Sequence, residues 1–249
     1  MRFRSAENIL QELRLIASLG YKEVFFRDEI FTVSKKRLLD VARGIVENKL
    51  DLTWICSARV GTIDEEMMKL MKQSGCHMIR IGAESGEQTI LDKVKKGIKI
   101  EETVSLLKLA HKYNIDVHAH MMIGMPGENR ETIMKTIRFA KRINPSVVTF
   151  GICTPYPGTL LFEEVKKVHP DIEDGSACNL EKLHKEGFFN SVFCSLNEEE
   201  LGRYIKRAYR LFYMRPNYLL GRLKSLSSFE KIKRELRAGL KVFSFSTEK

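Results

Sequence analysis

The sequence alternates short apolar runs with longer amphipathic stretches along most of its length. The runs are four to eight residues long and lie at 22–27, 52–57, 77–81, 116–122 and 145–152. They mix β-branched and aromatic residues, which is typical of strands buried in a sheet. Their starts recur every 25–39 residues, and right-handed crossovers of that length build a parallel sheet. The pattern therefore predicts an α/β fold, either an open doubly wound sheet or a full or partial barrel.

The stretches between the runs place apolar residues at the 3.6-residue period of a helix. Ser5 and Ser34 are predicted to cap two of these helices, a third is expected to begin at Thr62 or Ile63, and Gly75 is expected to end it. Further helices are predicted at 101–113 and 129–143. Because the chain opens with a helix, the repeat predicts that one strand and its loop belong in front of it.

The net positive charge of the chain comes entirely from its C-terminal part. The chain has 42 Lys and Arg against 32 Asp and Glu, and residues 201–249 hold 13 of the basic and 3 of the acidic side chains. The predicted domains are a core at 1–165, an irregular connector at 166–195 and a basic helical region at 196–249. We expect the helical region to dock on the core with its charges in solvent. A weaker alternative is contact of 201–249 with an anionic membrane surface. No apolar run reaches the ~18–20 residues that a membrane-spanning helix needs.

The five cysteines are odd in number and widely spaced, with the closest pair 16 residues apart. No CxxC-type metal motif is present, and a reducing, cytoplasmic location is the simplest interpretation. Cys56 and Cys153 lie near predicted strand ends, where we expect buried structural thiols.

Polar and glycine-rich segments follow each predicted strand. They are 27–29, 57–59, 82–86, 124–128 and 154–159. In parallel α/β folds these loops gather at the carboxyl edge of the sheet, where ligands bind. Carboxylates, an arginine and glycines that admit a close backbone approach would suit a mid-sized polar molecule with an amine, a carboxylate and a ring.

Read in order, these segments resemble the radical S-adenosylmethionine (radical SAM) superfamily, and most of all its cobalamin-domain-associated branch. The resemblance covers about residues 2–165. Its carriers are RSAEN at 4–8, FFRDEIFT at 25–32, WICSAR at 54–59, IGAESG at 81–86, MIGMPGE at 122–128 and TPYPGT at 154–159, with RLFYMRP at 210–216 as a weaker match.

The resemblance implies an enzyme with a partial (β/α)6 TIM-like barrel that lacks its first strand in this chain, followed by a C-terminal helical appendage. The family binds S-adenosylmethionine, reduces it with a [4Fe–4S] cluster and so generates a 5′-deoxyadenosyl radical. The resemblance also implies a small-molecule substrate, an electron donor such as a ferredoxin or flavodoxin, and possible use of cobalamin by the full-length protein.

Ten residues are implied as cofactor-binding: Asp28, Glu29, Ser57, Arg59, Glu84, Ser85, Gly124, Pro126, Gly127 and Tyr156. Asp28 or Glu29 would face the methionine amine. Arg59, Glu84 and Ser85 would meet the methionine carboxylate or the ribose. The loop from Gly124 would pass beside the adenine, with Tyr156 near it.

The family holds its cluster with three cysteines in a CxxxCxxC loop, and none of the five cysteines here has that spacing. The chain by itself is therefore expected to lack the cluster and the radical chemistry, whether as the product of a truncated gene, of a misassigned start or as a fragment. No catalytic residue and no metal ligand is assigned.

Two other functions remain as alternatives. A catalytically inactive barrel would serve as a scaffold or binding module. A metal-dependent hydrolase of the amidohydrolase type would use Asp116, His118 and His120, which alternate along one predicted strand. We expect the two histidines to be packed or hydrogen-bonded strand residues instead. The substrate is not specified by these motifs, and methyl transfer, ring rearrangement and methylthiolation all remain open.

Overall fold

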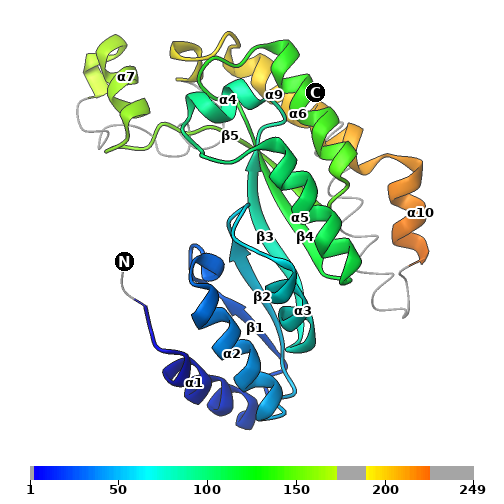
Figure 1. Cartoon of the computed structure of the whole chain (residues 1–249). Coiled ribbons are helices and arrows are strands. Elements are labelled where there is room, and N and C mark those ends of the chain that lie inside the picture. The colour runs from blue at the N-terminus through cyan, green and yellow to red at the C-terminus, as the bar shows by residue number, and fades with distance from the viewer. Residues whose placement is uncertain (1–2, 173–188, 225–249) are drawn as a thin grey trace. The chain divides into compact units, whose positions relative to one another are not determined.

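The computed structural model describes residues 3–172 and 189–224. Five strands form one sheet in the order β1-β2-β3-β4-β5, so each strand lies beside its predecessor in the sequence (Figure 1). The strands are β1 Glu23–Phe26, β2 Thr53–Ala58, β3 Cys76–Glu84, β4 Asp116–Ile123 and β5 Val147–Ile152. The α/β fold with an open sheet of five parallel strands is that of a partial barrel, as predicted.

Helices connect the strands and continue after them. They are α1 Ala6–Ser18, α2 Lys35–Glu47, α3 Glu65–Gln73, α4 Gln88–Lys93, α5 Ile100–Lys112, α6 Arg130–Ile143, α7 Leu160–Val168, α9 Glu198–Tyr213 and α10 Pro216–Lys224. Short 3₁₀ turns occupy Phe31–Val33, Pro170–Ile172 and Asn190–Val192. The short helix α4 is not signalled by the sequence pattern.

The described residues form two compact units, and each is considered by itself. The first contains Met1–Ala83, Ile98–His120 and Ile143–Val148. The second contains Glu84–Gly97, Met121–Arg142 and the chain from Thr149 onward. The domain boundaries predicted from the sequence stay a prediction.

The predicted caps of α1 and α2 are confirmed, because Ser5 accepts a hydrogen bond from the main chain of Asn8 and Ser34 from that of Arg37. The predicted start of α3 is wrong. Asp64 caps this helix by accepting from the Met67 N–H at 2.9 Å. Thr62 is engaged elsewhere, because its hydroxyl lies 2.6 Å from that of Thr32.

The first unit has a core of aromatic and sulfur-bearing side chains. Phe26 stacks on Phe31 at 4.3 Å, and the edge of Trp54 meets Phe26 at 5.5 Å. The methionines of α3 are all buried, as expected for core residues: Met67, Met68 and Met71. This packing holds the loop that follows β1 against the sheet.

In the second unit, α9 docks on β5 as the sequence predicted. Leu201, Ile205 and Phe212 of this helix are buried. The Tyr209 hydroxyl lies 3.3 Å from the main-chain nitrogen of Phe150. Pro216 begins α10 directly after α9 ends, which is the position that proline favours. The remaining predicted apolar stripe, from residue 226, lies outside the described residues.

No helix in the part of the chain that the structure describes is long and apolar enough to cross a membrane.

Candidate functional site

In the first unit, the loop after β1 carries Asp28 and Glu29 beside a cavity of about 620 Å³. The cavity lies between α1 and β1, and Leu13, Ile16 and Phe25 contribute apolar walls. Asp28 receives a hydrogen bond of 2.9 Å from Arg37, whose side chain is only 10% exposed. The Asp28 carboxylate is thus held in one orientation, although Asp28 and Glu29 are both exposed.

Ser57 and Arg59 lie at the end of β2 and are half-buried. The main-chain nitrogen of Arg59 donates to the Thr32 hydroxyl at 3.3 Å. Thr32 is itself buried, so it ties the loop after β1 to the loop after β2. These two loops, which the sequence placed at one edge of the sheet, are joined within the first unit.

In the second unit, Glu84 ends β3 in the left-handed backbone region, with φ +59°. This conformation is uncommon for a residue with a side chain and is costly unless the surroundings enforce it. Its carboxylate pairs with Lys96 at 2.6 Å, and the two side chains are 18% and 28% exposed. The strained backbone and the ion pair together fix where this carboxylate points.

Ser85 is fully buried, although it was predicted to contact the cofactor. Its hydroxyl lies 3.1 Å from that of Thr136 and accepts from the Glu87 main chain at 3.1 Å. The Thr136 hydroxyl also accepts from the Gly86 N–H at 3.0 Å. Ser85 therefore shapes the loop after β3 through bonds inside the protein.

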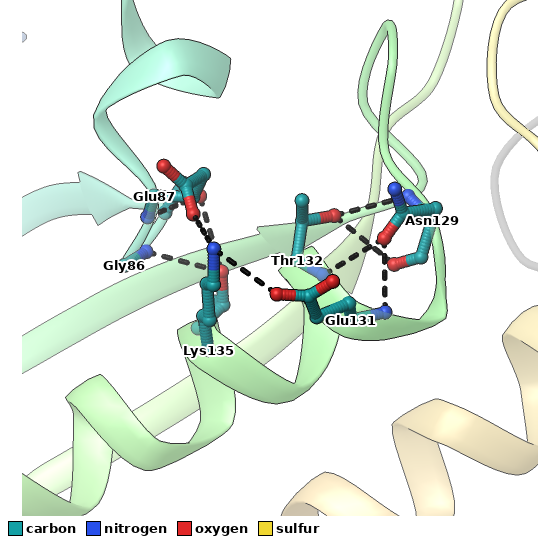
Figure 2. Close-up of polar contacts among 8 residues, drawn as sticks. Gly86, Glu87, Asn129, Glu131, Thr132 and Lys135 are labelled. Atoms are coloured by element: carbon teal, nitrogen blue, oxygen red, sulfur yellow. Dashed lines mark hydrogen bonds and ion pairs between the residues drawn. The ribbon is translucent and has the colours of Figure 1, made fainter.

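The same loop is fastened to the start of α6. Figure 2 shows Lys135 between two carboxylates, with Glu87 at 2.6 Å and Glu131 at 3.3 Å. Asn129 caps α6, because its side-chain oxygen accepts from the main chain of Glu131 and of Thr132. A side chain at Gly86 would meet the main chain of α6 at 2.8 Å, so only glycine permits this close approach.

The loop after β4 folds around the carboxylate of Glu128. This side chain is 1% exposed and accepts from the main-chain nitrogens of Gly124 at 2.7 Å and Met125 at 3.0 Å. Burial raises the pKa of Glu128 to about 7, because the charged form loses its hydration. The two bonds identify Glu128 as a support of the loop that the resemblance assigned to adenine.

Of the other predicted residues of this unit, Gly124 is buried, whereas three are more open. Gly127 is exposed with φ +81°, and Pro126 is half-buried beside it. Tyr156, after β5, is 46% exposed. An accessible backbone and an accessible ring are what a contact with a planar ligand requires.

Residues 190–195 pack on the loop after β4 and were missed from the sequence. Asn190 is fully buried and donates to the carbonyls of Gly124 at 2.7 Å and Cys153 at 2.8 Å. The Gly127 N–H donates to Phe193 at 2.8 Å. The polar segment around Asn190 has the composition of an irregular connector, so no periodic pattern in the sequence indicates its role.

Four cysteines lie in the described residues, and all are free and buried: Cys56, Cys76, Cys153 and Cys194. Burial raises the pKa of Cys153 to about 12 and raises that of Cys194. A hydrogen bond to Cys76, together with burial, raises the pKa of Cys56. The predicted burial of Cys56 and Cys153 is confirmed.

The histidines of β4 are packed strand residues, as expected. His118 and His120 stack at 4.2 Å, and Arg80 lies 3.1 Å from Nε2 of His120. Among the described residues, no group of three or more His, Cys, Asp or Glu side chains is arranged to hold a metal ion.

A model of the radical SAM superfamily matches residues 1–140. The chain belongs to the radical SAM superfamily. An uncharacterized methyltransferase of Pyrococcus horikoshii is 33% identical over 97% of this chain and 52% of its own length. An anaerobic magnesium-protoporphyrin IX monomethyl ester cyclase of Rubrivivax gelatinosus is 24% identical over 92% of this chain and 44% of its own length.

This radical SAM chain thus spans about half the length of the curated relatives it matches, and those relatives are enzymes. Among solved structures, the radical SAM methyltransferase TsrM from Kitasatospora setae, with cobalamin and a [4Fe–4S] cluster bound, superposes with a TM-score of 0.62. The match has 22% identity and covers 66% of this chain and 34% of TsrM. At that identity it shows the shared fold.

Proposed function

We propose that this radical SAM chain is the S-adenosylmethionine-binding part of a cobalamin-dependent methyltransferase. The observation that carries the proposal is Glu84, a carboxylate held in the left-handed backbone region and oriented by Lys96. Backbone strain of this kind persists where the surrounding structure enforces it, and such positions cluster at ligand sites. Glu84 is also one of the residues that the family motif assigns to the cofactor.

Each predicted residue has a chemical role in this proposal. The carboxylates of Asp28 or Glu29 accept hydrogen bonds from the methionine ammonium, and Arg59 donates to the methionine carboxylate. Glu84 accepts from the ribose hydroxyls. We assign Ser85 to positioning, because its hydroxyl bonds to Thr136 inside the protein.

The remaining proposed contacts involve the backbone and apolar surfaces. Gly124, Pro126 and Gly127 present the loop after β4 to the adenine, and the exposed Tyr156 ring lies against it. Ser57 adds a hydroxyl at the end of β2. When bound in an enzyme of this family, S-adenosylmethionine supplies the methyl group that is transferred or the 5′-deoxyadenosyl radical that is generated.

The described cysteines do not fit a [4Fe–4S] cluster. Cluster ligands are thiolates, whereas Cys56, Cys153 and Cys194 are buried with raised pKa values. The described residues therefore supply no set of cysteines for the cluster. Cobalamin, a ferredoxin or flavodoxin as electron donor, a small-molecule substrate and a cytoplasmic location belong to the proposal for the whole protein.

Methyl transfer is the favoured reaction, because the Pyrococcus horikoshii relative carries that name and matches nearly the whole chain. The cyclase relative supports ring rearrangement as a second candidate at lower identity.

Isothermal titration of the chain with S-adenosylmethionine tests the proposal. We expect saturable binding that weakens about tenfold in Glu84→Gln, since a hydrogen bond to a charged group contributes about 1.5–3 kcal/mol. Glu87→Gln is the matched control, because Glu87 lies on the same loop and also pairs with a lysine at 2.6 Å. It should bind within about twofold of wild type.

Absence of binding to the wild-type chain would overturn the proposal and support the scaffold interpretation. Equal weakening in both variants would show that charge alone, and not the Glu84 carboxylate, governs affinity.

A further inference from the structure

Two arginines of the first unit share one aromatic ring. The guanidinium carbon of Arg27 lies 5.0 Å from the centre of the Phe25 ring, and that of Arg80 lies 5.3 Å from it. Phe25 belongs to β1 and Arg27 follows that strand, whereas Arg80 comes from β3. The fold thus brings two permanent positive charges to a single phenyl ring.

These side chains lie on one face of the sheet. Phe25 pairs with Ile55 in register, and Ser57 of β2 pairs with Arg80 of β3. Arg80 is half-buried and alternates with Ile79 and Ile81, which are buried on the opposite face. The face with Arg80 is therefore the more open one.

The partner of Arg80 on β4 is neutral. Arg80 lies 3.1 Å from Nε2 of His120, and a guanidinium can only donate. His120 must therefore accept through Nε2 and carry its proton on Nδ1. Burial, together with the neighbouring His120 and Arg80, lowers the pKa of His118 to about 4, so this ring too is uncharged at neutral pH.

Within the described residues, neither Arg27 nor Arg80 has a carboxylate at ion-pair distance. The acidic groups of the adjacent strands are engaged elsewhere. Asp28 pairs with Arg37, Glu23 with His77, and Asp116 accepts from the Ser146 hydroxyl at 2.5 Å. In addition, Nε of Arg80 is buried without a hydrogen-bond partner. A partly buried charge of this kind costs free energy unless an anion pairs with it.

We propose that Arg27 and Arg80 bind an oxyanion, a carboxylate or phosphate group of a small organic molecule, on this face of the sheet. Planar guanidiniums match both groups through paired N–H donors. The assignment of that group to the substrate of the enzyme rests on the proposed function, whereas the binding of the oxyanion rests on the two arginines alone.

Histidine-detected NMR on the full chain tests the proposal, with inorganic phosphate and acetate as separate probes at constant ionic strength. We expect the ring resonances of His118 and His120 to shift saturably with at least one probe, and the exposed His111 to stay unchanged. The tighter of the two probes identifies the phosphate or the carboxylate as the preferred group.

Arg80→Gln and Arg27→Gln should each weaken the binding about tenfold, as the loss of a charge-assisted contact predicts. Arg43→Gln is the matched control, because Arg43 is an exposed arginine of the same unit that lies 3.7 Å from Asp40 and from Glu66. It removes the same charge and should leave the affinity within about twofold. Arg27 is itself exposed, so its variant decides the matter even where Arg80→Gln fails to fold.

Unsaturable shifts, or equal weakening in Arg43→Gln, would overturn the proposal. A titration of Arg80→Gln with S-adenosylmethionine distinguishes a failure of the oxyanion proposal from a failure of the proposed function. Unchanged cofactor affinity supports a distinct oxyanion site, whereas loss of cofactor affinity equal to the loss of phosphate affinity would assign the arginines to the cofactor and overturn it. Cofactor binding without any oxyanion binding would reject this site and leave the proposed function standing.

Discussion

The side-chain amide of Asn190 donates a hydrogen bond of 2.7 Å to the main-chain carbonyl of Gly124. The same amide donates to Cys153 at 2.8 Å, so one side chain joins the loops that follow β4 and β5. Asn190 lies outside the segment that the superfamily model matches. The proposed adenine loop of this chain is therefore supported by a residue beyond that segment.

Asn190→Ala should destabilise the second unit and weaken S-adenosylmethionine binding. The change leaves two buried carbonyls without their donor, at a cost of about 1–3 kcal/mol. Thermal denaturation and isothermal titration measure the two effects. Asn197→Ala is the control: it removes the N-cap of α9, costs about 1 kcal/mol, and should leave cofactor affinity unchanged. Equal cofactor affinity in both variants would show that Asn190 does not support the loop that binds S-adenosylmethionine.

Gly124→Ala should be more harmful than Gly158→Ala. Both glycines have a positive φ, +79° and +83°, so an alanine is strained at either position. At Gly124 the new Cβ would also lie 2.8 Å from the side-chain nitrogen Nδ2 of Asn190, whereas at Gly158 nothing lies within 4 Å of the new Cβ. Chemical denaturation should show about 1 kcal/mol lost at Gly158 and about 1–3 kcal/mol more at Gly124. Equal losses would mean that the loop shifts freely away from Asn190.

Glu128→Gln should remove a pH dependence of stability. The pKa of Glu128 is about 7 in the folded chain, against the usual 4.5 of a glutamate side chain. The folded state therefore holds a proton that the unfolded state has released, and the stabilisation is complete below pH 4.5 and lost as pH rises through 7. The shift corresponds to roughly 3 kcal/mol.

Urea denaturation between pH 4 and 8 measures this. The free energy of unfolding of Glu128→Gln should rise relative to wild type across that interval. Glu131→Gln changes an exposed carboxylate close by in the sequence and should follow the wild-type curve. A constant difference between wild type and Glu128→Gln would contradict the raised pKa.

His118→Gln should change the pH dependence in the opposite sense. The pKa of His118 is lowered to about 4 from 6.5. The stabilisation from the neutral ring is therefore present above pH 6.5 and lost as pH falls toward 4. In that interval the ring binds a proton in the unfolded state but not in the folded state, which favours unfolding. Denaturation at pH 5 and pH 7.5 should show a smaller decrease in His118→Gln than in wild type. His111→Gln, at an exposed position, should retain the wild-type decrease.

Strand positions and most helix boundaries were predictable from local pattern. Strand alternation and the caps at Ser5 and Ser34 depend on residues within a few positions of each other. The start of α3 was misplaced because two cap-forming residues, Thr62 and Asp64, lie in one short segment. Only the bond between Thr62 and Thr32, 30 residues away, leaves Asp64 to cap the helix.

By itself, the sequence determined the α/β class, the positions of the strands along the chain and the residues of each loop that the radical SAM motifs cover. These depend on periodicity and on short contiguous motifs. The tertiary structure alone decided that Ser85 is buried, that Asn190 holds Gly124 and that Arg27 and Arg80 share the ring of Phe25. The physical reason is that burial, hydrogen-bond partners and uncompensated charge depend on residues 50 or more positions apart, which meet only when the chain is folded.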